Sequence, residues 1–113
     1  MKPISKSSEK NVLNFFSSLA DETRLHILLS ISEKPKTVNE IYSAVGRSKM
    51  TLSAVSHQLK QLSDLGIVTY EKKGREKSFS LSSDYCWCIL RDVFKQFDSS
   101  VKVRCVKCMG GKK

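Results

Sequence analysis

The 113-residue sequence predicts a single, mainly α-helical domain with one small β-hairpin, an α+β fold. Three observations indicate this class. Apolar residues recur at helical spacing over most of the chain. The period changes once, in "IVTYEKKGREKSFSL", where β-branched and aromatic residues flank a turn at Lys73-Gly74. A net charge of +9, from 20 Lys and Arg against 11 Asp and Glu residues, favours an anionic partner such as nucleic acid.

The first part of the chain predicts a loose tail and two helices. Residues 1–8 are polar and are expected to form a flexible N-terminal tail. From Glu9 the apolar residues repeat at helical spacing, and they do so again after Asp21, which is a typical N-cap residue. Pro35 stops the second helix because proline has no backbone N–H group to continue it.

A pair of helices follows across a short turn. Thr37 and Glu40 form a capping box that opens a short helix, and Gly46 ends it. The next helix, in "TLSAVSHQLKQLSDLG", has an apolar stripe on one face and a polar opposite face. The stripe consists of Leu52, Val55, Leu59 and Leu62.

Two helices, the second with a polar outer face, and then a basic hairpin are the order of a winged helix-turn-helix. The major groove of DNA admits one α-helix, and the hairpin beside it reaches phosphates or the minor groove with long cationic side chains. The residues expected to contact double-stranded DNA are Arg47, Ser48, Lys49, Thr51, Ser53, Ser56, His57, Gln58, Lys60, Lys72, Lys73, Arg75 and Lys77. The alternatives are a solvated helix face and a basic surface for RNA or a protein complex, although protein interfaces are depleted in lysine.

The last part of the chain predicts a final helix from Ser83 and a basic tail. Residues 9–98 are then the DNA-binding and dimerisation domain, and residues 99–113 are the C-terminal tail. All four cysteines lie here, at Cys86, Cys88, Cys105 and Cys108. No apolar run approaches the ~20 residues of a membrane span and no secretory signal is seen, so we expect a cytoplasmic protein with reduced thiols. No phosphate-binding loop, HExxH motif or nucleophile–base pair indicates an enzyme.

Four stretches of the sequence resemble the ArsR/SmtB family of winged-helix repressors: "SLADETRLHILLSI", "TVNEIYSAVG", "AVSHQLKQLSDLGIV" and "GIVTYEKKGREKSFSL". The resemblance implies a homodimeric, cytoplasmic repressor that binds an inverted-repeat operator and leaves when an inducer binds. It also implies dimerisation through the first and last helices, which have more apolar surface than one small domain needs, including Phe15, Phe16, Trp87, Phe94 and Phe97. The turn "GRSKM" is longer than in the family, so the recognition helix begins either after Thr51 or earlier, after Ser48.

The inducer sites of the family can be compared with this chain. The arsenic-type Cys-x-Cys site is absent from "TVNEIYSAV". In the zinc-type site of the last helix, Asp84 is followed by Cys86 in place of histidine, and the second half falls at Phe97 and Ser100, which are poor zinc ligands. The four cysteines resemble instead the thiolate sites that other members use for soft metals and metalloids such as Zn, Cd, Pb or As(III).

The cysteine spacing leaves three hypotheses open. Cys105-x-x-Cys108 has a spacing at which two thiolates share a metal or close a disulfide. On a regular helix Cys86 and Cys88 diverge by about 200°, so one metal takes both only at a frayed first turn. The chain therefore has a metal or metalloid site that joins the tail to Cys86 or Cys88, or a redox switch at Cys105 and Cys108, or cysteines that sense nothing.

Overall fold

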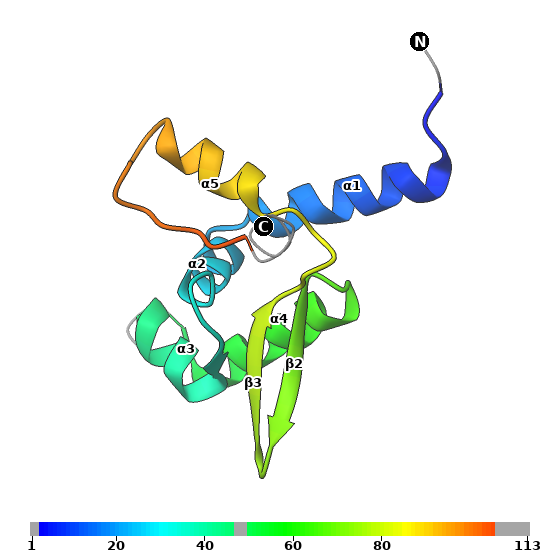
Figure 1. The fold of residues 1–113 in the computed structure, drawn as a ribbon. Helices are drawn as coiled ribbons and strands as arrows, with labels where there is room; N and C mark the ends of the chain where they lie inside the picture. The colour runs from blue at the N-terminus through cyan, green and yellow to red at the C-terminus, as the bar shows by residue number, and fades with distance from the viewer. Residues whose placement is uncertain (1–2, 47–49, 106–113) are drawn as a thin grey trace, which may run out of the picture.

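The computed structural model describes residues 3–46 and 50–105, and it has the order of elements of a winged helix-turn-helix (Figure 1). The elements are α1 (Lys6–Leu19), α2 (Glu22–Ser30), β1 (Lys36–Thr37), α3 (Val38–Val45), α4 (Leu52–Asp64), β2 (Val68–Lys73), β3 (Glu76–Leu81) and α5 (Cys88–Lys95). The predicted fold class is confirmed. Among the described residues, no helix is both long enough and apolar enough to cross a bilayer.

Side-chain caps fix the starts of the first four helices. Ser5, Asp21, Thr37 and Thr51 each accept a hydrogen bond from the backbone N–H three residues further on. The capping box at α3 is present in full, because the N–H of Thr37 also donates to Oε1 of Glu40 at 2.9 Å. The cap at Ser5 starts α1 at Lys6, so the first helix begins three residues before the predicted Glu9 and takes in part of the expected tail.

The sheet has three antiparallel strands in the order β1-β3-β2. The hairpin pairs Val68 with Leu81 at one end and Lys73 with Glu76 at the other. The turn is therefore Gly74-Arg75, one residue later than predicted, and its glycine has a φ of 64°, which this residue adopts readily. The sequence did not predict β1, because two residues are too short for a strand period; Lys36 pairs with Phe79 and Thr37 with Ser78.

The core lies between the helices and one face of the sheet. Its most completely buried side chains are Ile27, Leu28, Ile41, Val55, Leu59, Leu62 and Ile67. Of the stripe predicted on α4, only Leu52 departs, with 40% of its surface exposed, because it is the first residue of the helix and lies beyond the edge of the core. Burial of the stripe turns the opposite face of α4 to solvent.

The last helix begins at Cys88 and not at Ser83, so the predicted boundary is wrong. A buried tryptophan explains the shorter helix. Trp87 is 1% exposed, its Nε1 donates to the carbonyl of Ser82 at 2.8 Å, and its ring lies 5.4 Å from that of Phe15. Phe15 and Trp87, expected as surplus aromatic surface, are therefore part of the core of the protomer.

Residues 99–105, expected in a tail, pack against the domain. Val103 and Cys105 are buried. The N–H of Arg104 donates to the carbonyl of Ser32 at 3.2 Å, and the hydroxyl of Ser32 donates to the carbonyl of Lys102 at 3.2 Å. The ordered domain therefore extends at least to Cys105.

Candidate nucleic-acid interface and thiol cluster

The outer face of α4 presents four of the predicted contact residues to solvent, namely Ser53, Ser56, His57 and Lys60. Two other predicted contact residues, Thr51 and Gln58, do not lie on this outer face. Thr51 is exposed, and its hydroxyl caps α4 by accepting from the N–H of Ala54 at 3.1 Å. Gln58 is half-buried and faces α2. The recognition helix therefore begins after Thr51, and not after Ser48.

Arg24 on α2 supports the recognition helix, a role that sequence reasoning missed. Its Nε donates to Oε1 of Gln58 at 2.8 Å and its Nη2 to Oε1 of Gln61 at 3.1 Å. Gln61 Nε2 lies in turn 3.2 Å from His57 Nε2 on the outer face. The available signal was an arginine among the apolar residues of "TRLHILL", but its partners are 34 and 37 residues away.

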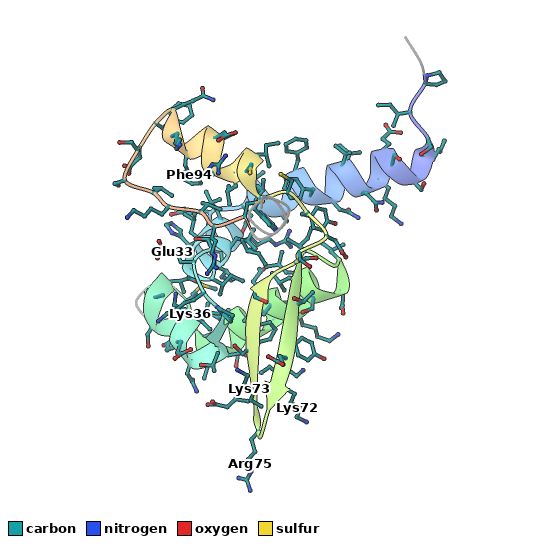
Figure 2. The ribbon with its side chains drawn as sticks, viewed as in Figure 1. Glu33, Lys36, Lys72, Lys73, Arg75 and Phe94 are labelled. Atoms are coloured by element: carbon teal, nitrogen blue, oxygen red, sulfur yellow. The ribbon has the colours of Figure 1, made fainter. Side chains whose placement is uncertain are left out.

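The hairpin carries its cations at the end far from the helices. Lys72, Lys73 and Arg75 lie at the tip, and all are exposed (Figure 2). Lys77, opposite Lys72 in the ladder, places its Nζ 4.3 Å from the ring centroid of Tyr70. Arg47, Ser48 and Lys49, also predicted to contact DNA, lie outside the described residues.

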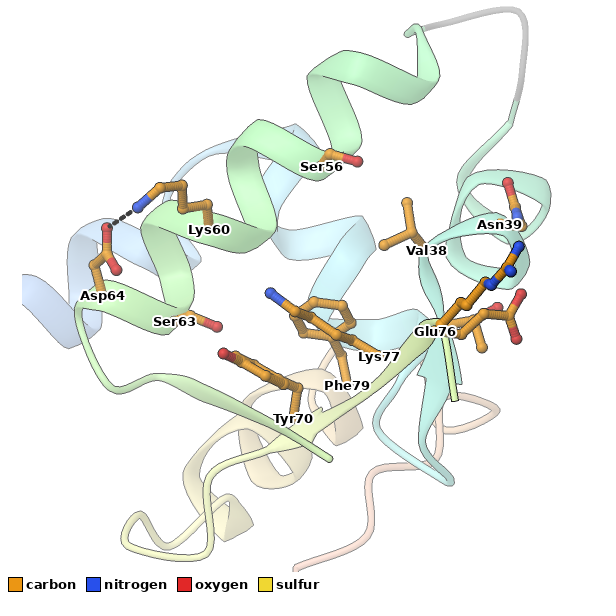
Figure 3. A pocket seen from close by; sticks show the side chains of 12 residues that line it. Val38, Asn39, Ser56, Lys60, Ser63, Asp64, Tyr70, Glu76, Lys77 and Phe79 are labelled. Carbon is orange, nitrogen blue, oxygen red and sulfur yellow. Dashed lines mark hydrogen bonds and ion pairs between the residues drawn. The ribbon is translucent and has the colours of Figure 1, made fainter. Parts of the chain in front are cut away.

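A groove of about 570 Å³ runs between α4 and the hairpin (Figure 3). Lys60, Arg75 and Lys77 line it, together with Asp64 and Glu76. Nζ of Lys60 lies 3.2 Å from Oδ2 of Asp64, so this pair has little net charge. The lining that remains is positive, which suits a polyanion.

Three thiols meet at the start of α5. The Sγ atoms of Cys86, Cys88 and Cys105 all lie within 4.8 Å of one another, and Sγ of Cys105 is 3.9 Å from Sγ of Cys86. The N–H of Trp87 donates to Sγ of Cys105 at 3.2 Å. Because α5 begins at Cys88, Cys86 is outside the helix and the 200° divergence does not apply. We name Cys86, Cys88 and Cys105 the thiol cluster.

The thiol cluster joins the two parts of the chain that the metal hypothesis required to meet. Cys86 is exposed, Cys88 is half-buried and Cys105 is 2% exposed. The prediction that Cys86 is buried is therefore wrong, whereas Cys88 does pack partly against the core. Cys108, the fourth predicted ligand, lies outside the described residues, and Asp84 is not a member of the group that the structure brings together.

An apolar surface covers the outer sides of α1 and α5. Its exposed members are Val12, Leu13, Phe16, Ile89, Val93 and Phe97. A shallow apolar hollow of about 480 Å³ lies between the two helices and reaches Cys86. The sequence predicted Phe16 and Phe97 for this surface and missed the aliphatic members, which look like core residues when burial is unknown.

Comparison with known proteins agrees with this arrangement. The family described as "Bacterial regulatory protein, arsR family" matches residues 21–70. A transcriptional repressor SmtB homolog of Synechocystis is 30% identical over 97 residues, which are 86% of this chain and 71% of that one. A cadmium resistance transcriptional regulatory protein CadC homolog of Staphylococcus aureus is 29% identical over 82% of this chain and 75% of its own length.

Comparison with solved structures shows that the similarity extends to the fold. The solution structure of apo-NmtR is 30% identical and superimposes with a TM-score of 0.67 over 85% of this chain and 78% of that one. The identity and the coverage extend beyond the helix-turn-helix to nearly the whole described chain. The chain therefore belongs to the ArsR family of bacterial regulatory proteins and is a DNA-binding transcriptional regulator.

Proposed function

We propose that the chain is a cytoplasmic, homodimeric repressor that binds an inverted-repeat operator and leaves it when a soft metal ion or metalloid binds the thiol cluster. The observation that carries the inducer part is the approach of three Sγ atoms to within 4.8 Å of one another. The candidates are Zn, Cd, Pb and As(III), since thiolates prefer soft and borderline ions.

The DNA-binding part is supported by the different side chains of α4 and the hairpin. Ser53, Ser56 and His57 are exposed on one helix face, where short hydrogen-bonding side chains can meet base edges in the major groove. The hairpin cations have long side chains with many rotamers, which suit phosphates better than individual bases. Sequence specificity is therefore expected from α4, and the salt-dependent part of affinity from the hairpin.

Homodimerisation is supported by the apolar surface on α1 and α5. Monomeric proteins rarely expose large contiguous apolar patches, and this surface has five large apolar side chains on α1 and α5 and a sixth, Phe97, just beyond the end of α5. A second copy with the same surface would bury it in a two-fold interface. Two recognition helices related by that axis would enter successive major grooves about 34 Å apart, which requires an inverted repeat.

The metal part is supported by the composition of the cluster. Three thiolates form the ligand set of a three-coordinate As(III) or Pb(II) site, and with one further donor they suit tetrahedral Zn(II) or Cd(II). Cys86 is exposed, so an ion has a way in, while Cys105 lies in the protein interior. The similarity to a cadmium resistance regulator is consistent with a soft ion.

A chain of contacts leads from the thiol cluster to the helix-turn-helix. An ion bound by all three thiols would tie residues 101–105 to the start of α5. Those residues are hydrogen-bonded to Ser32, and the nearby Lys36 donates through Nζ to the carbonyl of Ser30. Thr37, next in the chain, caps α3. Inducer binding can thus bias the position of α3 and α4 relative to the rest of the protomer.

A second candidate is a thiol redox switch, and one distance favours it. Sγ of Cys105 is 3.9 Å from Sγ of Cys86, so these two thiols need to move by about 2 Å to reach a disulfide S–S length. Among the described residues, Cys86 is therefore a candidate disulfide partner of Cys105, and the predicted pairing with Cys108 remains a second candidate. Oxidation by a peroxide would take two electrons and two protons from the thiols and yield water.

The test of the metal part uses the reduced full-length chain under argon. Cd(II) and arsenite are titrated separately while thiolate-to-metal charge-transfer absorption is recorded. We expect one ion per protomer, and a large loss of affinity in each of Cys86→Ser, Cys88→Ser and Cys105→Ser. Cys108→Ser is the matched control and is expected to keep the same end point. A site that survives the three cluster variants and disappears with Cys108→Ser would contradict the proposal.

The test of the DNA part begins by selecting bound duplexes from a random-sequence library. We expect the selected duplexes to share an inverted repeat with half-sites one helical turn apart. Duplexes with a single half-site, or no enrichment at all, would contradict the proposed dimeric operator.

A further inference from the structure

The groove between α4 and the hairpin is lined in part by polar side chains, such as Ser63 and Tyr70, that were not among the DNA contacts predicted from the sequence. One wall comes from α4 and the other from β2 and β3, including Phe79, and Val38 of α3 also lines it (Figure 3). Besides Asp64, Arg75 and Glu76, the polar side chains that line it from the two walls are Ser56, Lys60, Ser63, Tyr70 and Lys77. Its volume of about 570 Å³ is in the range of ligand-binding pockets, and it exceeds what one small anion needs.

Ser63 has a buried hydroxyl that the rest of the groove does not satisfy. Its Oγ makes no hydrogen bond among the described residues. By contrast Ser17, Ser18 and Ser30 each donate to the carbonyl three residues back in their own helices. A buried hydroxyl that forgoes this local bond is costly unless something else satisfies it. In Figure 3 the oxygen of Ser63 points across the groove toward the hydroxyl of Tyr70.

A cation lies beside these hydroxyls. Nζ of Lys77 lies 4.3 Å from the ring centroid of Tyr70, and its ammonium points toward α4 (Figure 3). The two carboxylates of the groove do not oppose it there. Asp64 is paired with Lys60 at 3.2 Å, and Glu76 lies at the other end of the groove beside Asn39. The end formed by Ser63, Tyr70 and Lys77 therefore offers two hydroxyl donors and one ammonium donor.

We propose that Ser63, Tyr70 and Lys77 form a phosphate site that grips one phosphodiester of the operator strand between the recognition helix and the wing. This inference rests on the proposed DNA-binding face. A helix in the major groove and a hairpin beyond its edge must have the intervening sugar-phosphate strand between them. Three donors from two elements fit the two non-bridging oxygens of such a phosphate, and the groove has room for the attached sugars.

The same chemistry could be offered by a free phosphate or a phosphorylated small molecule. The position between the two DNA-contacting elements favours the strand, because a small anion there would occupy the place of the DNA backbone. The test therefore needs one arm that changes a single DNA phosphate and another that supplies free phosphate.

The experiment is a double-mutant cycle between protein and DNA. Duplexes selected with the full-length chain are made with a neutral methylphosphonate at one position at a time, and affinity is measured by fluorescence anisotropy for wild type, Ser63→Ala and Tyr70→Phe. Each substitution removes one hydroxyl, and Tyr70→Phe keeps the ring under Lys77. We expect each variant to bind the unmodified duplex roughly tenfold more weakly, as for loss of a hydrogen bond to a charged group.

The decisive result is the DNA position at which the loss of affinity from the protein substitution and the loss from the methylphosphonate are not additive. At one phosphate per half-site, the methylphosphonate should weaken binding by wild type. At that same phosphate it should weaken binding by Ser63→Ala and Tyr70→Phe only slightly, because each variant already binds the unmodified duplex more weakly. Ser17→Ala, on the outside of α1, is the matched control and should behave as wild type at every position. Losses that add at all positions would overturn the site while leaving DNA binding intact. Failure of wild type to bind any selected duplex would overturn the proposed function as well.

The second arm adds inorganic phosphate at constant ionic strength. The strand assignment predicts no specific displacement of the duplex. If phosphate displaced the duplex from wild type but not from Ser63→Ala, the groove would serve a free anion, and the assignment to the DNA backbone would be wrong.

Discussion

The two ends of the molecule are ordered in different ways. At the end formed by α3, α4 and the hairpin, the starts of the two helices and the turn of the hairpin are set by residues close in the sequence: caps three residues apart and a two-residue turn (Figure 1). The end formed by α1, α5 and residues 99–105 relies on distant interactions. Trp87 packs against Phe15, and Cys105 lies against Cys86.

This difference has a functional meaning. A recognition element must have one shape before it meets DNA, and local caps and turns provide that at little entropic cost. A sensing element must have a shape that a ligand can alter, and a segment held by a few long-range interactions meets that need. The thiol cluster lies where two such segments meet: residues 86–88 at the start of α5 and residues 101–105.

The largest expected effect comes from breaking the long-range packing at its centre. Trp87→Ala removes a 1%-exposed side chain and its hydrogen bond to Ser82, and should lower the free energy of unfolding by about 3–5 kcal/mol. Urea denaturation followed by circular dichroism measures the change. Lys95→Ala, on α5 but exposed and outside the apolar surface, is the control and should cost less than about 0.5 kcal/mol. Equal costs for the two would mean that Trp87 does not organise this end.

A smaller effect is expected at the tip of the hairpin, where function changes without a change in fold. Lys73→Ala with Arg75→Ala should weaken binding to all duplexes and lower the slope of log affinity against log salt by about 1 for each phosphate that the variant no longer neutralises. Anisotropy at four salt concentrations measures the slope. The free energy of unfolding should stay within about 0.5 kcal/mol of wild type, because both side chains are exposed. An unchanged slope would show that the hairpin tip does not touch DNA.

The smallest expected effect concerns one cap. Thr51→Ala removes the hydroxyl that accepts from the N–H of Ala54 and should cost about 1 kcal/mol, whereas Thr51→Gly should cost a few tenths. Thermal unfolding of the two variants gives the order. If alanine were tolerated better than glycine, α4 would not begin at this cap.

The sequence predicted the local end of the molecule well. The cap of α3 at Thr37, and that of α4 at Thr51 as one of two alternatives, follow from side chains that bond to the backbone three residues ahead, a spacing that is visible in the sequence itself. The outer face of α4 follows from the burial of Val55, Leu59 and Leu62. What it missed here were β1 and the support by Arg24, since both depend on partners more than 30 residues away.

The distant end was predicted less completely. The start of α5 was placed five residues early, because helical spacing of apolar residues cannot reveal that Trp87 turns inward and holds the preceding residues in a turn. That same inward turn makes Cys86 a neighbour of Cys88 and Cys105. The sequence could name the cysteines, but only the packing of residues 101–105 against Ser32 decides which of them meet.

The most direct test of the proposed repressor measures whether an ion that binds the thiol cluster releases the protein from DNA. The reduced, metal-free chain is bound to a fluorescent selected duplex, and Cd(II), Zn(II), Pb(II), arsenite and a peroxide are added in separate anisotropy titrations. The proposed mechanism predicts release by at least one soft ion, and no release by that ion in Cys86→Ser or Cys105→Ser proteins that still bind the duplex. Tight binding that no ion relieves, or release that persists in both variants, would contradict it.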